Sequence, residues 1–500
     1  MHRLILATIA TLLSFGTVTM ADAKNENSVT IYSSAKPGAV PPDLYRPRPG
    51  RGLYTGQVPG FAVVRHDRSY DIASGSSWLR VTNVSALIEP TTVTFQSLSN
   101  PDTRVLEQSF EFDLVSNDKL LQRYLGQSVV VEQIRGDAVD TIEGTLVGIS
   151  GGLILQDRNG GVRTVNTYSS IRFPELPGGL ITRPTLVWLL NSKKAGSQDT
   201  RISYQTDGMT WWADYNAVLD ESRDCRLDLN AWVSIINQSG TSYPDARLKL
   251  IAGDVHRASA PQDQRRIVTK MAMMEADGAG FEEKEFFEYH LYTLGRSTDL
   301  PDNATKQLEL FPAAKGIKCT KELVFAPSRG FRYYGGTSLD QNYGRVAQAD
   351  IGVFLRFQNE KDNQLGIPLP AGRIRVNQID KDDDSMEFIG EDVIDHTARD
   401  EQILIELGNA FDVVGERKQT DFRVDSRTRQ LWESFEIKLR NHKSEKVEVA
   451  VIESLYRAAN WKIQSPSHQY EKTNAHTIRY DVAIDPDDEA VVTYTVHYSW

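Results

Sequence analysis

The chain has 500 residues, of which 40% are apolar and 25% are charged, and its formal net charge is −11 at pH 7. A single hydrophobic core stops growing at roughly 250 to 300 residues, so several domains are expected. The acidic balance, without a cluster of Lys and Arg, argues against a nucleic-acid-binding protein because binding a polyanion requires a basic face.

Residues 1–23 have the pattern of a secretory signal peptide. An apolar stretch runs from Leu4 to Met20, and Ala21 and Ala23 supply the small residues that signal peptidase requires. We therefore predict cleavage after Ala23 and an exported protein, either periplasmic or secreted, with outer-membrane association as a further option. No later stretch is apolar enough and long enough to predict a membrane-spanning helix.

The next residues predict a linker followed by strands. Residues 24–60 are polar and rich in proline, a composition typical of an extended linker. From Phe61 onward, short runs of alternating apolar residues are separated by turn-forming clusters, which is the pattern of antiparallel strands. Residues 61–115, continued by 180–220, are expected to form an N-terminal β domain.

Residues 116–176 interrupt this strand pattern. Ser116 predicts a helix N-cap, and apolar residues follow it at helical spacing as far as Gly126. Several short strands come next, with Asn159 and Gly160 in a predicted hairpin turn. One short helix followed by short strands resembles an Sm-like or SH3-like small barrel, and such a likeness carries no function by itself.

The remaining sequence predicts two further domains. Residues 221–345 are expected to form a middle β-sandwich, with strands that include 306–311 and 321–325. Residues 258–283 are expected to be a mobile loop because they are long and lack a strand pattern. Residues 346–500 predict a C-terminal β-sandwich. The predicted fold class is all-β, with two or three antiparallel β-sandwich domains and an inserted small barrel.

Four residues stand out as candidates for a bridge or a binding site. Cys225 and Cys319 are the two cysteines of the chain, and they form a disulfide if the exported protein brings them together. Two separately buried thiols are the alternative. Tyr333 and Tyr334 precede a pair of glycines in an aromatic turn, which makes them candidates for stacking on a sugar ring, with a packing or loop role as the alternative.

The segment TWWADY, residues 210–215, places two tryptophans side by side in a predicted strand. Neighbouring residues of a strand point to opposite faces of the sheet. We therefore expect one of Trp211 and Trp212 to be buried and the other to be exposed or covered by a second domain, rather than both forming one stacking platform.

No catalytic, cofactor-binding or metal-binding residues are predicted. Residues 380–391 place aspartates and a glutamate at several positions of a calcium loop, but Ser385 stands where the sharp turn requires glycine. The flanking residues alternate as strands do, so an acidic hairpin tip is favoured. Residues 148–152 fit the pattern G-x-S-x-G of a nucleophile elbow, but strand-like sequence follows, so a glycine turn is favoured.

The C-terminal part carries the segments ISYQTDGMTWWADY, IPLPAGRIRV, FIGEDVIDHT and LGNAFDVVGERKQTDF. Together with neighbouring segments from about Pro184 to Trp500, they resemble the bacterial domain-of-unknown-function 4139 family, some members of which are labelled mucoidy inhibitor proteins. Better-known members carry a long coiled coil upstream, where this chain has strands and the predicted small barrel. The resemblance implies an exported, envelope-associated β-sandwich protein without assigned catalytic residues.

The function predicted from these observations is that of a non-enzymatic envelope protein that binds a protein partner or an envelope polysaccharide, because the sequence has abundant strands and no convergent set of titratable groups. One alternative is an envelope hydrolase that uses a carboxylate pair such as Asp392 and Asp395. The other is an outer-membrane β-barrel protein, because residues 492–500 alternate to the end of the chain as the last strand of such barrels does.

Overall fold

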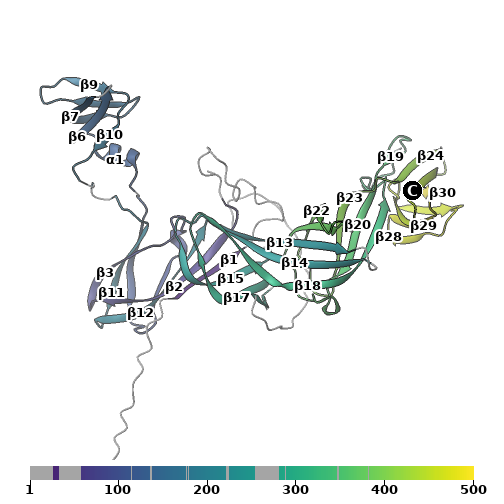
Figure 1. Cartoon of the computed structure of the whole chain (residues 1–500), viewed down its shortest axis with the longest axis horizontal. Helices are drawn as coiled ribbons and strands as arrows, with labels where there is room; N and C mark the ends of the chain where they lie inside the picture. The colour runs from purple at the N-terminus through teal and green to yellow at the C-terminus, as the bar shows by residue number, and fades with distance from the viewer. Residues whose placement is uncertain are drawn as a thin grey trace, which may run out of the picture.

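A computed structural model gives the fold of the chain. It describes residues 26–32, 58–113, 115–135, 138–175, 177, 180–220, 225–253, 281–287, 289–345, 348–380 and 382–500. The predicted signal peptide, most of the predicted linker and most of the predicted loop 258–283 lie outside these residues. The described part is elongated, with the predicted small barrel at one end and the C-terminal strands at the other (Figure 1).

A seven-stranded sheet lies in the N-terminal half of the molecule. In spatial order its strands are Phe281–Phe286 (β16), Tyr289–Leu300 (β17), Tyr243–Ala252 (β15), Glu26–Tyr32 (β1), Phe61–Ile72 (β2), Gly196–Asp207 (β12) and Thr94–Ser97 (β4). β1 is parallel to β15 and antiparallel to β2. The first strand of the chain thus lies inside the sheet and not at its edge.

Two predicted boundaries are wrong in this sheet. Residues 26–32 are not part of a linker, because Val29 and Ile31 of β1 are fully buried in the core. The proline-rich residues that follow concealed this short strand. Residues 281–283 are not part of a loop but begin β16, which is an edge strand. An edge strand tolerates charged side chains, and those of β16 obscure the alternation that would predict a strand.

The largest sheet has ten strands. Eight of them follow one path: Met386–Ile394 (β22), Gly372–Ile379 (β21), Met209–Asp220 (β13), Arg226–Asn237 (β14), Ala304–Phe325 (β18), Val447–Ser454 (β26), Thr477–Ile484 (β29) and Glu471–Asn474 (β28). The other two are Ile351–Gln358 (β20), which pairs with β18, and Gln402–Asn409 (β23), which pairs with β20. A short 3-10 turn, Lys361–Asn363 (η3), follows β20.

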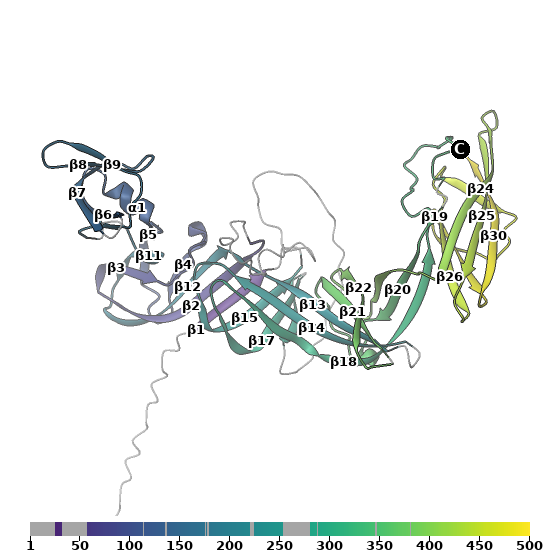
Figure 2. The same cartoon turned by 45° about the horizontal axis from the view of Figure 1, so that its top comes forward.

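The strand β18 connects the two halves of the molecule. It has 22 residues and pairs first with β14 and then with β20 and β26. Figure 2 shows it running from the middle of the molecule to the C-terminal strands. Most pairings in this sheet are antiparallel, but β13 with β21 and β18 with β26 are parallel.

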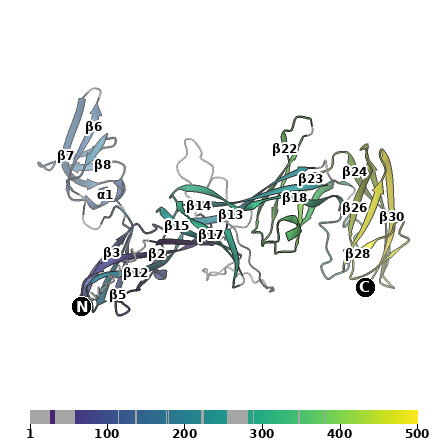
Figure 3. The ribbon, with the colours of Figure 1, turned by 60° about the horizontal axis from the view of Figure 1, so that its bottom comes forward.

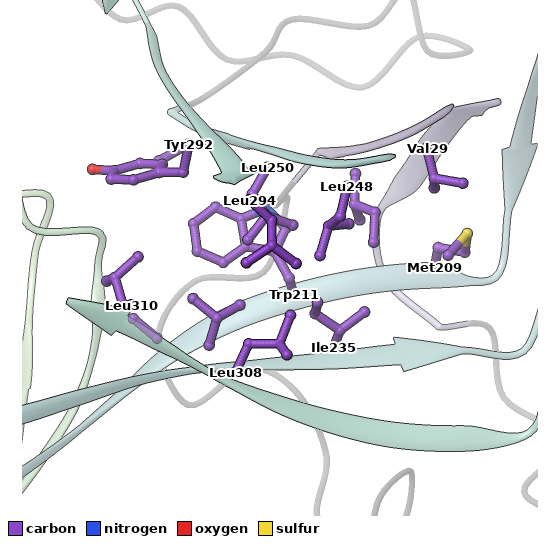
Figure 4. Close-up of a cluster of buried hydrophobic side chains, with 14 of the residues drawn as sticks. Val29, Met209, Trp211, Ile235, Leu248, Leu250, Tyr292, Leu294, Leu308 and Leu310 are labelled. Atoms are coloured by element: carbon purple, nitrogen blue, oxygen red, sulfur yellow. The ribbon is translucent and has the colours of Figure 1, made fainter. Parts of the chain in front are cut away.

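One continuous core fills the space between the seven-stranded sheet and the middle of the ten-stranded sheet. Figure 4 shows Trp211 of β13 between Leu248 and Leu250 of β15 and Leu308 of β18. The same buried cluster includes Trp188 from the N-terminal region. The predicted N-terminal domain and middle sandwich therefore share a core, and a boundary near residue 220 is wrong, because β1, β2 and β12 pair in one sheet with β15.

Two smaller sheets are built from strands between residues 75 and 192. One consists of Gly75–Thr82 (β3), Thr185–Ser192 (β11) and Arg104–Glu111 (β5), with the 3-10 turn Pro90–Thr92 (η2) nearby in sequence. The other consists of Ser170–Arg172 (β10), Ser128–Arg135 (β6), Ala138–Gly148 (β7), Leu153–Gln156 (β8) and Val162–Val165 (β9), packed on the helix Asn117–Arg123 (α1). Ser116 caps this helix through its side chain, as predicted.

The unit of α1 and β6 to β10 has a core of its own around Val131 and Leu146. Figure 3 shows it standing apart from the sheet that contains β3 and β5. Its described strands form a sheet with β10 and β9 at the two edges, so closure into a small barrel stays a prediction. Gly148 to Gly152 join β7 to β8 as a hairpin turn, and the glycine-turn interpretation is confirmed.

A second large core lies in the C-terminal region. Its outer layer is the sheet of Gln348–Ala349 (β19), Val413–Asp425 (β24), Gln430–Asn441 (β25), Asp488–Ser499 (β30) and Asn460–Gln464 (β27). This sheet packs against β26, β29 and the end of β18, which contributes Leu323 and Phe325. The predicted domain start at residue 346 is wrong, because Leu355 of β20 and Ile405 of β23 belong to the first core.

The fold class predicted from the sequence is confirmed. The described chain is almost entirely β, and its sheets pack in pairs as sandwiches. The alternation of residues 492–498 is that of a half-buried strand, since Val492, Tyr494, Val496 and Tyr498 of β30 are all buried in the second core.

Candidate functional site

The structure joins Cys225 and Cys319 in a disulfide, with their Cα atoms 5.2 Å apart. Cys225 precedes β14, and Cys319 lies within β18. The backbone amide of Cys319 donates to the carbonyl oxygen of Cys225 at 3.1 Å. Since the bond ties together two strands that already pair, it braces the sheet rather than forming a reactive centre.

The adjacent tryptophans of β13 face opposite sides of the sheet, as predicted. Trp211 is fully buried, and its indole Nε1 donates to the carbonyl oxygen of Ile251 at 3.3 Å. Trp212 is half-buried. The strand motif therefore serves packing and offers no shared aromatic platform.

A groove of about 540 Å³ lies on the C-terminal part of the ten-stranded sheet. Its floor is made of side chains that alternate with those of the second core. On β18, for example, Val324 lines the groove while Leu323 and Phe325 face the core. On β29, Arg479 lines the groove while Tyr480 faces the core. One side of the sheet thus holds the sandwich together, and the other presents the groove.

One wall of the groove is the segment 326–345, which connects β18 to β19 and is here called the tyrosine segment. The half-buried ring of Tyr333 lines the groove and stacks on His476, with ring centroids 5.2 Å apart. Tyr334 is 81% exposed and does not line it. Of the two tyrosines predicted to stack on a ligand, the structure therefore places Tyr333 in a wall and Tyr334 beside it.

An aromatic trio forms part of this wall, since Phe331 and Tyr456 line the groove and Tyr343 packs against both. The ring centroids of Phe331, Tyr343 and Tyr456 lie 5.3 Å from one another. Burial raises the pKa of Tyr456 to about 12, so its hydroxyl stays protonated near neutral pH. This hydroxyl donates to the carbonyl oxygen of Tyr343 at 3.3 Å.

Buried charges hold the far end of the tyrosine segment. Arg457 and Glu433 are 0% and 1% exposed, and the guanidinium donates to both carboxylate oxygens at 2.7 and 2.8 Å. The same guanidinium donates to the backbone carbonyl oxygens of Ser338, Asp340 and Tyr343, at 3.3, 2.7 and 2.9 Å. A single arginine therefore provides hydrogen bonds to three backbone carbonyl groups of an irregular segment. Backbone carbonyl groups that are buried without a hydrogen-bond partner are energetically unfavourable.

A second buried pair lies beside the first. The guanidinium of Arg417 donates to Glu453 at 3.0 Å and to the carbonyl oxygen of Gly344 at 3.1 Å. Burial opposes its charge, but the Glu453 carboxylate outweighs burial and raises the pKa of Arg417 above its usual value. Tyr494 also donates to Glu453 at 2.8 Å. Arg417, Glu453, Arg457 and Glu433 are together called the arginine clamp below.

The arginine clamp was not predicted from the sequence. Its four members lie on or beside different strands, and charged residues are usually exposed. A signal was available in β26, where Glu453 continues the inward-facing series of Val449 and Val451. A charge in phase with core residues predicts a buried partner.

The lining of the groove is basic. It contains four arginines and the single carboxylate of Glu322: Arg329, Arg332, Arg356 and Arg479. Glu322 receives the Arg356 guanidinium at 2.6 Å. Among the residues that the structure describes, the Nε atom of Arg356 and the Nδ1 atom of His476 are buried without a hydrogen-bond partner.

Of the carboxylate pair considered for catalysis, Asp392 has a structural role, and the backbone carbonyl oxygen of Asp395 accepts from the Thr397 hydroxyl at 2.8 Å. The Asp392 carboxylate accepts from the backbone amides of Val393 and Glu406, at 2.7 and 2.8 Å. β21 and β22 pair as a hairpin, and at its tip the backbone amide of Asp380 donates to the carbonyl oxygen of Ser385 at 2.9 Å, which confirms the hairpin-tip interpretation. Across the described ranges, no three His, Cys, Asp or Glu side chains are arranged to hold a metal ion. No helix in the described chain is long and apolar enough to cross a membrane.

The family model described as "Domain of unknown function (DUF4139)" matches residues 200–500. The chain belongs to this family. No curated protein matches the chain. The DUF4139 region begins within β12 and contains the disulfide, the arginine clamp and the groove, whereas β1, β2 and the unit of α1 and β6 to β10 precede it. The resemblance predicted from the sequence motifs is thus confirmed at the level of the family.

Proposed function

We propose that the protein is exported to the cell envelope and acts there as a non-enzymatic binding protein, with an envelope polysaccharide held in the groove beside the tyrosine segment. The observation that carries this proposal is the groove itself: an aromatic wall that faces an open sheet surface and is held by the buried arginine clamp. Its volume of about 540 Å³ is in the range typical of small-ligand sites.

The geometry of Tyr333 supports a saccharide ligand. Its ring is fixed on one side by stacking on His476, so the conformational entropy lost when a ligand packs on it is small. A sugar ring presents an apolar face of C–H groups, and an aromatic ring offers matching contact area. The exposed ring of Tyr334 extends the aromatic surface beyond the groove.

Two features support export. The first 23 residues have the signal-peptide pattern, and the sole two cysteines of the chain are bonded to each other. Disulfides persist in oxidising compartments such as the periplasm and are rare in the cytosol.

The chemistry of the lining supports binding rather than catalysis. General acid–base catalysis needs a titratable group poised to exchange a proton with the ligand. The carboxylate in the lining, Glu322, is engaged in an ion pair with Arg356 at 2.6 Å, so it already has a partner within the protein.

The test is a pull-down of isolated envelope polysaccharide by the mature protein and by Tyr333→Ala. We expect the wild-type protein to retain polysaccharide and Tyr333→Ala to lose about two- to tenfold in affinity, because one aromatic contact supplies roughly 0.5–1.5 kcal/mol. Phe411→Ala is the matched control, since Phe411 is 94% exposed and lies outside the groove lining. Equal retention by all three proteins contradicts the proposal.

A further inference from the structure

We infer that the ligand of the groove carries carboxylates, so that the site selects an acidic saccharide over a neutral one. This inference rests on the proposed function, because it assigns a chemical class to the ligand of the same groove. It depends on the arginine side of the groove, defined as Arg329, Arg332, Arg356 and Arg479.

The charge of the groove is opposite to that of the whole chain. The chain carries a formal net charge of −11, whereas the lining has four arginines and one carboxylate. Two more carboxylates lie next to the lining, since Glu406 pairs with Arg329 at 3.4 Å and Asp481 pairs with Arg479 at 2.7 Å. Four guanidinium groups against three carboxylates leave the groove with a positive excess on an acidic molecule.

The excess charge lies on Arg332, because each of the other three arginines has a carboxylate partner. Among the described residues, Arg332 has neither a hydrogen bond nor an ion pair, and it lines the groove with an exposed side chain. A guanidinium binds a carboxylate through two parallel N–H groups, and such charge-assisted bonds are stronger than neutral ones. A carboxylate is therefore the ligand group that these donors fit.

The site favours a saccharide over an acidic peptide. Peptides gain affinity from sheets by adding a strand at an edge, where backbone groups are unpaired. The floor of this groove is a sheet face, and β18, β20, β26 and β29 each pair with neighbours there. Recognition must come from side chains, and the Tyr333 ring together with the arginines supplies one surface for a sugar ring and another for its carboxylate.

The experiment is calorimetric titration of the mature full-length protein with hexameric oligogalacturonate and with its fully methyl-esterified form. The two probes share the sugar rings and differ in charge. We expect the acidic hexamer to bind at least about tenfold more tightly than the ester, and we expect added salt to weaken the acidic hexamer selectively because ions screen exposed charges.

Variants locate the effect. Arg332→Gln should weaken binding of the acidic hexamer about tenfold, the order expected for one charge-assisted bond, and should leave the ester unchanged. This variant should not disturb folding, because Arg332 has no partner in the described chain. Arg158→Gln is the matched control, since Arg158 is 88% exposed on the distant unit of α1 and β6 to β10. It should leave both affinities unchanged.

Several outcomes overturn the inference. Equal binding of the two hexamers with loss of both in Tyr333→Ala removes the selectivity for acids but leaves a saccharide site in the groove. Tighter binding of poly-L-glutamate than of the acidic hexamer assigns the groove to acidic peptides. Absence of binding by both hexamers overturns the inference, and the polysaccharide pull-down then decides whether the proposed function falls with it.

Discussion

Replacing Arg457 with leucine should weaken the C-terminal sandwich by about 3–5 kcal/mol, the cost of breaking a buried ion pair by removing one partner. The structure gives the reasons for that size. Glu433 is 1% exposed and would lose its cationic partner, with Gln419 as a remaining donor at 2.7 Å. The carbonyl oxygens of Ser338, Asp340 and Tyr343 would lose the guanidinium that they share.

The assay for Arg457→Leu combines urea unfolding with limited trypsin digestion. The tyrosine segment contains the trypsin sites Arg329, Arg332 and Arg345. Since the arginine clamp holds this segment, the variant should be cut there faster than the wild-type protein, at urea concentrations where the remaining chain is intact. The sites become accessible when the segment opens locally.

Two further variants make the reasoning refutable. The double variant Arg457→Leu/Glu433→Leu removes both charges, so it should be more stable than Arg457→Leu alone. Arg440→Leu is the matched control on β25, because Arg440 and Glu416 form an ion pair at 3.7 Å with both side chains more than a third exposed. It should cost less than about 1 kcal/mol. A loss in Arg457→Leu no larger than in Arg440→Leu, or a double variant no better than the single one, refutes the account of the arginine clamp.

Two more predictions concern stability. The Cys225→Ser/Cys319→Ser variant should have a free energy of unfolding about 4–5 kcal/mol lower, because the bridge joins residues 94 apart and so closes a large loop in the unfolded chain. A thiol assay of the denatured wild-type protein should find no free thiol. Unchanged stability of the variant would contradict a bracing role. Burial lowers the pKa of His66 to about 3, so the unfolded chain binds a proton that the folded chain does not. The free energy of unfolding is therefore highest above pH 6.5 and falls as the pH drops toward 3, by about 2 kcal/mol between pH 7 and 5. Urea unfolding at these two pH values should show that His66→Gln lacks this fall. An equal fall in the variant and the wild-type protein would contradict the prediction.

The parts of the fold that could be predicted are the strands with one buried face. β13 and β30 alternate between core and partly exposed positions over most of their length, and a period of two is readable from sequence. β18 was predicted as two strands, 306–311 and 321–325, because its central residues break the alternation where its pairing with β14 shifts register. Such bulges have no simple sequence signature.

The candidate site could be predicted only in part. The aromatic turn at Tyr333 and Tyr334 was visible because tyrosines next to glycines are uncommon in packed strands. The rest of the groove, including Arg356, Arg479 and His476, comes from other parts of the sequence. Which strands become neighbours depends on the parallel pairing of β18 with β26, and the local pattern of either strand carries no information about that pairing.

Photo-crosslinking in cells tests the central claim, that the groove holds an envelope polysaccharide, most directly. The variant Tyr334→p-benzoylphenylalanine places the crosslinker at an 81% exposed position beside the groove, and Phe411→p-benzoylphenylalanine places it at a 94% exposed position outside the lining. The account predicts a carbohydrate-containing adduct in the envelope fraction from position 334 and none from position 411. Adducts of equal yield at both positions, adducts that contain protein without carbohydrate, or adducts formed only in the cytoplasm would contradict it.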